Sequence, residues 1–362
     1  MKKPFSFCVL TISAMMSTQI FAANNASPLA LKKEKKAKFV KNKGSNQLPQ
    51  NTASESTISL TPERQVSTNG TNHLGDLQYM PRTGEINASV ELSTRPESVT
   101  ASFKGKDAIT VKESNFIQAY KVNYGINEKM AAGVTLEHFI SGKREAEVVQ
   151  QKKTINTKAT GLADPTINGT YRLGTQAINK VNTDLTLSVS PSLIKAEEGS
   201  EDKSGSRGRG AMLVQGQVEV GAKLARVDVS ANATIGIVGE REIKDIKSAE
   251  KYKIDSATTI SLGGAVRHEF TETLALKGGL GLTFVPEDKR TQAGETFYKM
   301  DSFTRFSFMG EGQYSIVPEK VLAKLQVKIN TEGSRTLALG DTKLDVDNSS
   351  GQVFLLGTEF LF

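Results

Sequence analysis

Two consecutive stretches, MLVQGQVEVGAKL at 212–224 and RVDVSANATIGI at 226–237, decide the fold of this chain. In the first stretch the even-numbered residues are apolar or glycine, and in the second the apolar residues are odd-numbered. Side chains on a β-strand alternate between two faces, so each stretch is a half-apolar strand. The change of parity places a tight turn around Ala225.

The same alternation recurs from residue 84 to the end of the chain, and no window shows a helical period of comparable strength. The alternating segments run for about 9 to 13 residues, whereas strands of soluble proteins commonly have about 5 or 6. A tilted membrane-spanning strand needs about 9 to 11 residues. We expect twelve strands, near 85–94, 115–124, 130–140, 164–173, 183–194, 210–224, 226–238, 257–270, 274–285, 302–316, 320–331 and 351–362.

The links between these segments alternate between short and long. Links such as 125–129, 271–273 and 317–319 are tight, whereas those on the other side are long, polar and charged. Short periplasmic turns and long outer loops are typical of bacterial outer-membrane barrels. The sequence therefore predicts an all-β fold, a transmembrane antiparallel up-and-down β-barrel over residues 84–362. Residues 99–112 also alternate. They form either an extension of the first hairpin above the membrane or two further strands, in which case the barrel would have fourteen strands.

The composition agrees with a barrel rather than a helical membrane protein. Hydrophobic residues make up 38% of the chain, the mean hydropathy is −0.31, and no segment after the N-terminus has the roughly 18 apolar residues of a spanning helix. Aromatic residues are only 6% and tryptophan is absent, so the aromatic girdles of such barrels are expected to be thin.

The final segment has a face built mainly from large apolar residues. This face comprises Phe354, Leu356, Thr358, Phe360 and Phe362. It resembles the C-terminal signal of outer-membrane barrel proteins, in which a terminal Phe closes the barrel. The resemblance implies that the barrel assembly machinery is a partner through Phe362.

The N-terminus predicts export. Residues 1–22 have the order of a secretory signal peptide, with Lys2 and Lys3, an apolar stretch, and small residues at the cleavage point. Cys8, the single cysteine, lies inside it, so the mature chain has no thiol chemistry. We expect a mature protein in the bacterial outer membrane of a Gram-negative cell envelope, in contact with membrane lipid.

Residues 23–83 are expected to form a flexible basic periplasmic arm, because they are polar and lack a sustained apolar period. Of the formal net charge of +7, Lys2 and Lys3 contribute +2 and residues 32–43 contribute +6, which leaves −1 for the rest. An exported chain rarely meets nucleic acid, so we expect no nucleic-acid partner. The arm is either a solvated linker or, being attached at the periplasmic rim, a plug for the pore.

A short motif carries a family resemblance. The sequence GLADPTINGTYRL at 161–173 resembles the Gly-Leu-Gly-Asp loop and Tyr-Arg-Leu strand of the MetA pathway of phenol degradation family, with Ala163 in place of the third loop residue and Pro165 after the Asp. Tyr124-Gly125 resembles that family's tyrosine-glycine turn. The resemblance covers residues 115–362 in layout, and it implies an outer-membrane channel for small molecules, hydrophobic and aromatic ones among them.

If the apolar faces meet lipid, the opposite faces line the interior. They carry eight basic and ten acidic residues, a mixture without the single-sign ring that gives strong ion selectivity. These charges either pair and close a structural or adhesive barrel that acts through its outer loops, or line a narrow channel for small molecules, which is the reading we favour. The lumen-lining candidates are Lys121, Arg172, Glu219, Asp228, Arg267, Lys277, Arg305, Glu311, Lys324 and Lys328.

The sequence offers no convincing catalytic or metal site, so we expect neither an enzyme nor a cofactor. Some outer-membrane barrels use a Ser or Asp activated by a His. Here His73 falls in the arm, while His138 and His268 share the lipid-facing parity at opposite rims. Asp341, Asp345 and Asp347 match no EF-hand spacing and indicate a solvated loop.

Overall fold

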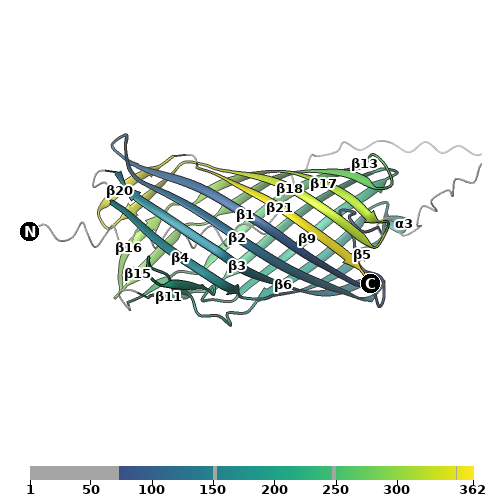
Figure 1. Ribbon diagram of the computed structural model, residues 1–362, viewed down its shortest axis with the longest axis horizontal. Coiled ribbons are helices and arrows are strands. Elements are labelled where there is room, and N and C mark those ends of the chain that lie inside the picture. Colours follow the sequence, from purple (N-terminus) through teal and green to yellow (C-terminus); the bar gives the residue numbers. More distant parts are fainter. Residues whose placement is uncertain (1–72, 150–152, 247–249, 348) are drawn as a thin grey trace, which may run out of the picture.

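The computed structural model describes residues 73–149, 153–246, 250–347 and 349–362. The predicted signal peptide and residues 23–72 of the predicted arm lie outside this part of the chain. Figure 1 shows an elongated barrel whose strands all tilt in the same sense. No helix in the described ranges has the length and hydropathy needed to cross a membrane.

Within the described residues, twelve antiparallel strands form a closed barrel, which confirms the predicted fold class and strand number. The last strand pairs with the first, with Phe360 opposite Ala88 and Leu356 opposite Leu92. In order around the wall the strands are β1 (Ile86–Phe103), β2 (Lys106–Asn127), β3 (Met130–Val148), β5 (Thr166–Gly174), β6 (Asn182–Ser190), β9 (Leu213–Leu224), β10 (Val227–Val238), β13 (Ala257–Glu269), β14 (Leu274–Val285), β17 (Phe303–Val317), β18 (Val321–Glu332) and β21 (Ser349–Leu361).

The short turns gather at one end of the barrel, near the C-terminus (Figure 1). The turn between β9 and β10 comprises Ala225, at φ 55°, and Arg226, as the parity change predicts. A short helix, α3 (Gln176–Asn179), occupies the link between β5 and β6 and ends at Lys180 in the left-handed region. By the usual arrangement of such barrels, this is the periplasmic end.

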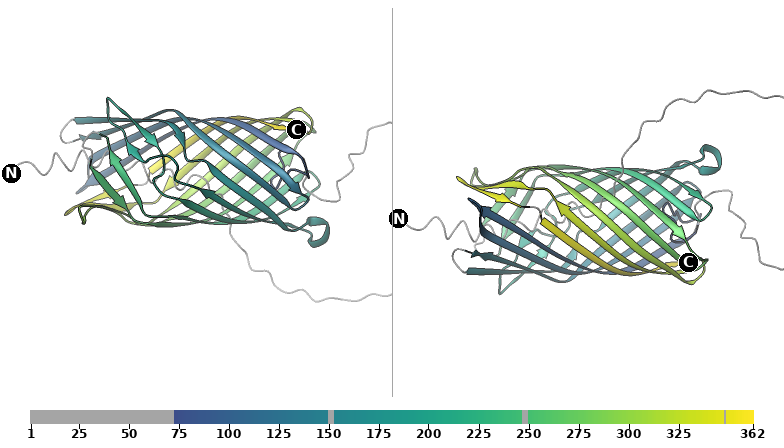
Figure 2. Two further views of the ribbon diagram at one scale, coloured as in Figure 1. Left: turned by 90° about the horizontal axis from the view of Figure 1, so that it is seen from below. Right: turned by 90° about the horizontal axis from the view of Figure 1, so that it is seen from above.

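At the opposite end the wall continues as an outer tier. Residues 99–112 extend the first hairpin, as the first of the two readings predicts, because β1 and β2 stay paired from Thr94 opposite Phe116 up to Phe103 opposite Lys106. The remaining strands of the outer tier, seen at one end of both views in Figure 2, are β4 (Lys153–Ala163), β7 (Glu197–Glu198), β8 (Ser204–Arg207), β11 (Arg241–Asp245), β12 (Lys251–Ile254), β15 (Asp288–Gln292), β16 (Glu295–Met300), β19 (Arg335–Leu339) and β20 (Thr342–Val346).

The long links predicted as polar loops therefore contain paired strands. β12 pairs with β15, β16 with β19, and β20 with β1, so adjacent hairpins join edge to edge above the wall. The stretch that contains Asp341 and Asp345, expected to be a solvated loop, is the tip and second strand of the β19–β20 hairpin. Its alternating apolar residues account for this, since they point into the barrel.

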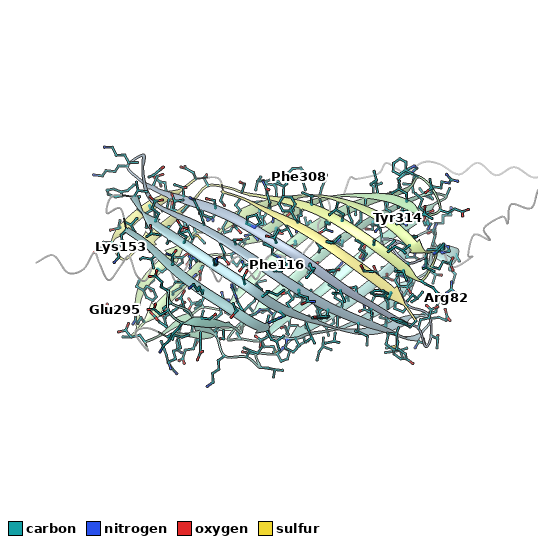
Figure 3. All side chains as sticks on the ribbon, viewed as in Figure 1. Arg82, Phe116, Lys153, Glu295, Phe308 and Tyr314 are labelled. Carbon is teal, nitrogen blue, oxygen red and sulfur yellow. The ribbon has the colours of Figure 1, made fainter. Side chains whose placement is uncertain are left out.

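The outer surface of the wall carries an apolar band. Phe116, Phe308 and Tyr314 project outward from it (Figure 3) and are 39%, 51% and 55% exposed. Above the band the exposed residues become charged, beginning with Lys112 on β2 and Lys143 on β3. An apolar band around a closed barrel is what a lipid bilayer requires. The protein is an outer-membrane β-barrel, and the outer tier stands above the bilayer.

Aromatic residues mark the two edges of this band, sparsely, as the composition predicts. Tyr124, Tyr171 and Tyr314 lie on the strand ends nearest the short turns, and Phe284 and Phe306 lie toward the outer ends of β14 and β17. Amphipathic Tyr rings suit the headgroup level.

Candidate functional site

The membrane-spanning part of the barrel encloses a cavity of about 480 Å³. Ionisable and amide side chains from strands on all sides of the wall face it, because the lipid-facing positions take the apolar half of each alternation. Its charged lining includes Glu91, Lys121, Glu137, Glu219, Lys277 and Lys328. The centre of the barrel is therefore a polar space.

The ten charged residues singled out from the sequence all lie at inward positions of their strands. Lys121, Glu219, Lys277 and Lys328 line the central cavity. The other six contact other side chains of the interior. They are distributed along the barrel from the periplasmic end to the outer end: Arg172, Asp228, Arg267, Glu311, Lys324 and Arg305.

Several of these residues form ion pairs across neighbouring strands. Lys121 Nζ lies 2.7 Å from Glu91 Oε2, and Arg305 Nε donates to Glu332 Oε1 at 2.7 Å. Lys324 pairs with Glu359. Acids and bases are thus mixed in the interior, and these ten residues form no ring of one sign.

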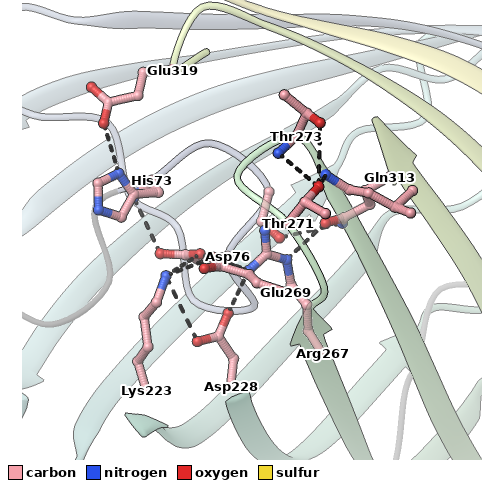
Figure 4. Close-up of polar contacts among 12 residues, drawn as sticks. His73, Asp76, Lys223, Asp228, Arg267, Glu269, Thr271, Thr273, Gln313 and Glu319 are labelled. Carbon is pink, nitrogen blue, oxygen red and sulfur yellow. Dashed lines mark hydrogen bonds and ion pairs between the residues drawn. The ribbon is translucent and has the colours of Figure 1, made fainter. Parts of the chain in front are cut away.

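The segment 73–82, which precedes β1, lies against the inner wall at the periplasmic end of the lumen. We call this segment the plug. The side chain of Asp76 is fully buried, and its Oδ1 accepts hydrogen bonds from Lys223 Nζ at 2.8 Å and from Arg267 Nη1 at 3.0 Å. Arg267 also donates to Asp228 and Glu269, at 3.0 and 2.8 Å (Figure 4). One carboxylate of the plug therefore completes an ionic network of five residues, four of which belong to the wall.

Further polar contacts hold the plug along its length. Arg172 donates to the carbonyl oxygen of Gln78 at 2.7 Å, and Gln78 donates to the carbonyl oxygen of Glu219 at 3.3 Å. Gln313 donates to the carbonyl oxygen of Gly75 at 3.3 Å. Gly75 has φ +96°, and a Cβ there would lie 2.9 Å from Leu322, so the wall approaches the plug too closely for a side chain.

The plug corrects one part of the sequence-based view. Residues 73–83 were expected to belong to a flexible arm, and His73 was assigned to it, but His73 lies against the wall with its Nδ1 3.0 Å from Glu319 (Figure 4). Leu74, Asp76, Gln78 and Met80 are all buried. The alternation of these four buried residues is a short local signal. Their partners lie 94 to 191 residues away in sequence, so no local pattern identifies them.

The outer tier has a different interior. Its inward-facing side chains pack into an apolar core contributed by β1, β2, β3, the ends of β14 and β17, and the hairpins β15–β16 and β19–β20. Ala101, Tyr298 and Leu337 are completely buried in it. The core fills the side of the outer tier formed by these strands.

The interior side chains change character along single strands. On β1 the inward residues near the periplasm are polar, such as Asn87 and Ser89, whereas Val99 and Ala101 point inward in the outer tier. The outward residues change in the opposite direction, from Val90 to Ser98. Lipid outside favours polar residues inside, and water outside favours an apolar core, so the inversion marks the membrane boundary.

A buried ion pair is enclosed in the outer tier. Arg290 Nε donates to Asp288 Oδ2 at 2.9 Å, and the guanidinium lies 4.3 Å from the centre of the Tyr298 ring. Burial raises the pKa of Tyr298 to about 12, so this ring stays neutral.

The motif that carried the family resemblance has a structural role. Asp164 Oδ1 accepts hydrogen bonds from the backbone N–H groups of Leu193 and Ile194, both at 2.8 Å, and Oδ2 accepts one from Arg209 N–H at 2.6 Å. One carboxylate thereby fastens both ends of the outer link 191–212 to the start of β5. The sequence identified the residue but not its partners.

His138 and His268 are partly exposed side chains at separate places on the wall, as their parity predicts. The His268 ring packs edge-on against Phe270 at 4.6 Å between ring centres. In the part of the chain that the structure describes, no group of three or more His, Cys, Asp or Glu residues is arranged to hold a metal ion.

No protein-family model and no curated protein matches the sequence. Solved structures do match the fold. The COG4313 outer membrane channel from Pseudomonas putida F1 is 13% identical, with a TM-score of 0.53 over 80% of this chain and 99% of that chain. The transport unit of the autotransporter AIDA-I from Escherichia coli is 8% identical, with a TM-score of 0.51 over 79% and 93%. Both similarities concern the fold, and they agree with the outer-membrane barrel that the sequence motif implied.

Proposed function

We propose that the protein is an outer-membrane channel for small molecules and that the structure represents its closed state. The observation that supports this most strongly is a row of cavities that share wall residues. An outer groove of about 800 Å³ shares Lys143 and Arg144 with a cavity of about 120 Å³, which in turn shares Arg95 and Glu137 with the central lumen. A barrel that served only as an anchor would have no need of such a series.

The plug is suited to leave the lumen. It pairs with no strand of the wall. Side-chain ion pairs and single hydrogen bonds hold it, together with the burial of Leu74 and Met80. Ion pairs of this kind can be exchanged for water, whereas extraction of a wall strand would break a whole ladder of backbone hydrogen bonds. The periplasmic closure is therefore the gate in this proposal.

The lumen favours small solutes without strong charge selection. Its charged lining is mixed: Lys121 pairs with Glu91, and Lys277 and Glu219 line the same cavity. Fixed charges of both signs create no single-sign barrier to ions. We propose that small polar and amphipathic molecules pass, with small aromatics as the first class to test.

The test is single-channel conductance of the refolded mature protein in planar bilayers, with heat-modifiable gel mobility to show that the barrel has folded. Stepwise openings, together with uptake of small aromatics into protein-containing liposomes, are expected. A folded protein that remains electrically silent and admits no solute contradicts the proposal.

A second function has one observation in its favour. The outer tier is a packed structure with its own apolar core, unlike a set of mobile loops, and presents a fixed surface outside the cell. A closed barrel that acts as an adhesive or structural platform would use that surface. A protein that folds but does not conduct would favour this alternative.

A further inference from the structure

The cavity of about 120 Å³ lies between β3, β4, β11 and the link 191–212, on the side of the outer tier away from the apolar core. Seven Lys or Arg side chains and five Asp or Glu side chains line it. Arginines predominate among the bases, and Arg144, Arg209 and Arg241 come from three different elements. The cavity is therefore a place where the fold gathers positive charge.

Three guanidinium groups at this cavity are incompletely satisfied. Arg144 is 5% exposed, and none of its three side-chain nitrogens has a hydrogen-bond partner among the described residues. Arg241 is 8% exposed. Its Nε and the Nη1 of Arg209 also have no hydrogen-bond partner among the described residues. A buried charge without a partner is costly, and proteins retain one mainly where something else completes it.

The acids of the cavity form no hydrogen bonds to these guanidinium nitrogens. Glu113 and Glu198 attract the charge of Arg144, but each has a hydrogen-bond partner of its own. Asp164 accepts three backbone N–H groups. Glu113 accepts from Asn115 at 2.7 Å, and Glu198 accepts from the Tyr252 hydroxyl at 3.3 Å. Burial raises the pKa of Glu198 to about 7 and lowers the pKa of Arg241 to about 10, as expected for charges that lack full compensation.

The walls also suit an organic ligand. Phe139, Ile243 and Tyr252 contribute apolar surface to the cavity. One water-sized sphere occupies roughly 10–15 Å³ of such space, so the cavity has room for about ten heavy atoms. A guanidinium fork binds a carboxylate through two parallel hydrogen bonds. We propose that this cavity binds a small organic carboxylate, with Arg144 and Arg241 holding the carboxylate group and the apolar wall holding its body.

Equilibrium binding tests this without reference to conductance, so failure here is distinguishable from failure of the channel proposal. Benzoate is titrated into the refolded mature protein in detergent micelles, and binding is measured by calorimetry and ligand-observed NMR. Benzamide serves as the uncharged analogue and inorganic phosphate as the anion without an apolar body. Benzoate is expected to bind, and benzamide and phosphate at least tenfold more weakly.

Arg144→Gln is expected to weaken benzoate binding at least tenfold, and Arg241→Gln tests the same site if the first variant does not fold. Arg226→Gln makes the same chemical change on an exposed turn at the opposite end and should leave binding unchanged. Without benzoate, Arg144→Gln should be at least as heat-stable as the native protein, because it removes an unpaired buried charge.

Three results would overturn the proposal. Equal benzoate affinity in the native protein and in Arg144→Gln would show that Arg144 does not bind the carboxylate. Phosphate or benzamide binding as tightly as benzoate would exclude an organic carboxylate as the ligand. A clear loss of heat stability in Arg144→Gln without benzoate would show that Arg144 is already paired within the protein, for instance with Glu113.

Discussion

The two ends of this barrel are filled by opposite kinds of chemistry. At the periplasmic end, one short segment without strand pairing is held by an ionic network around Asp76, Lys223 and Arg267. In the outer tier, paired strands pack an apolar core in which Leu337 and Tyr298 are fully buried. The plug depends largely on exchangeable polar contacts, whereas the apolar core is part of the folded outer tier and occupies one side of it.

The difference follows from the solvent that surrounds each region. Inside the bilayer the apolar half of every strand faces lipid, which leaves polar residues for the lumen and polar contacts as the means to fill it. Above the bilayer the outer face meets water, so the apolar half turns inward and packs. A releasable segment is thus expected inside the bilayer and a permanently packed core above it.

The largest effect is expected from the apolar core. Leu337→Ala removes a completely buried side chain and should destabilise the outer tier by about 2–5 kcal/mol. Amide hydrogen exchange in β19 and β20 should rise, while the membrane-spanning parts of β17 and β18 stay protected. Lys343→Ala, on an exposed position of the same hairpin, is the control. Equal loss of protection throughout the wall would mean that the outer tier is not a separate unit.

The periplasmic closure should respond to a smaller change. Asp76→Asn keeps the size of the side chain but removes its charge, and the plug should bind the lumen less tightly by about 1–3 kcal/mol. Exchange of the plug amides should rise, with no change in the outer tier. Glu319→Gln, which removes an exposed charge opposite His73, should have much less effect. Plug protection that is unaffected by Asp76→Asn would show that the ionic network does not hold it.

A pH dependence is expected in the outer tier. Burial raises the pKa of Glu198 from its usual 4.5 to about 7, so the folded state binds this proton more tightly than the unfolded state. Stability should therefore fall as pH rises from about 4.5 to 7 and stay lower above it. At about 1.4 kcal/mol per pKa unit, discounted for partial exposure, Glu198→Gln should gain about 1–2 kcal/mol at pH 8 and nothing at pH 4. Thermal unfolding at both pH values checks this, and an equal gain at both would contradict it.

The smallest effect is expected at the outer surface. Lys253 and Glu240 form an exposed ion pair, with Nζ 2.8 Å from Oε1. Lys253→Ala should change neither thermal unfolding nor exchange in β12, because exposed pairs contribute little. A measurable loss would mean that surface charges help to hold the outer tier together.

The membrane-spanning wall was predictable because the lipid imposes a rule on every second residue. The alternation at 212–224 and 226–237 predicts β9 and β10 to within a few residues, and the parity change locates their turn. The inward positions of Arg172 and Arg267 follow from the same rule.

The apolar core of the outer tier and the plug were harder to predict, for different reasons. The run at 335–346 contains Leu337, Leu339, Leu344 and Val346 in strand alternation, but its charges suggested a solvated loop. The plug depends on contacts between Asp76 and residues such as Arg267, 191 positions away, which no local pattern encodes. The cavity of about 120 Å³ was likewise not predicted, because its lining residues come from elements that are separate in sequence.

The most direct measurement compares two deletions in planar bilayers. Removal of residues 23–72 takes away the basic arm and leaves the plug, and removal of residues 23–80 takes away most of the plug as well. We predict that the shorter deletion conducts like the full mature protein and that the longer one shows frequent, long-lived openings. Equal conductance in all three folded proteins would contradict the claim that the plug is the gate.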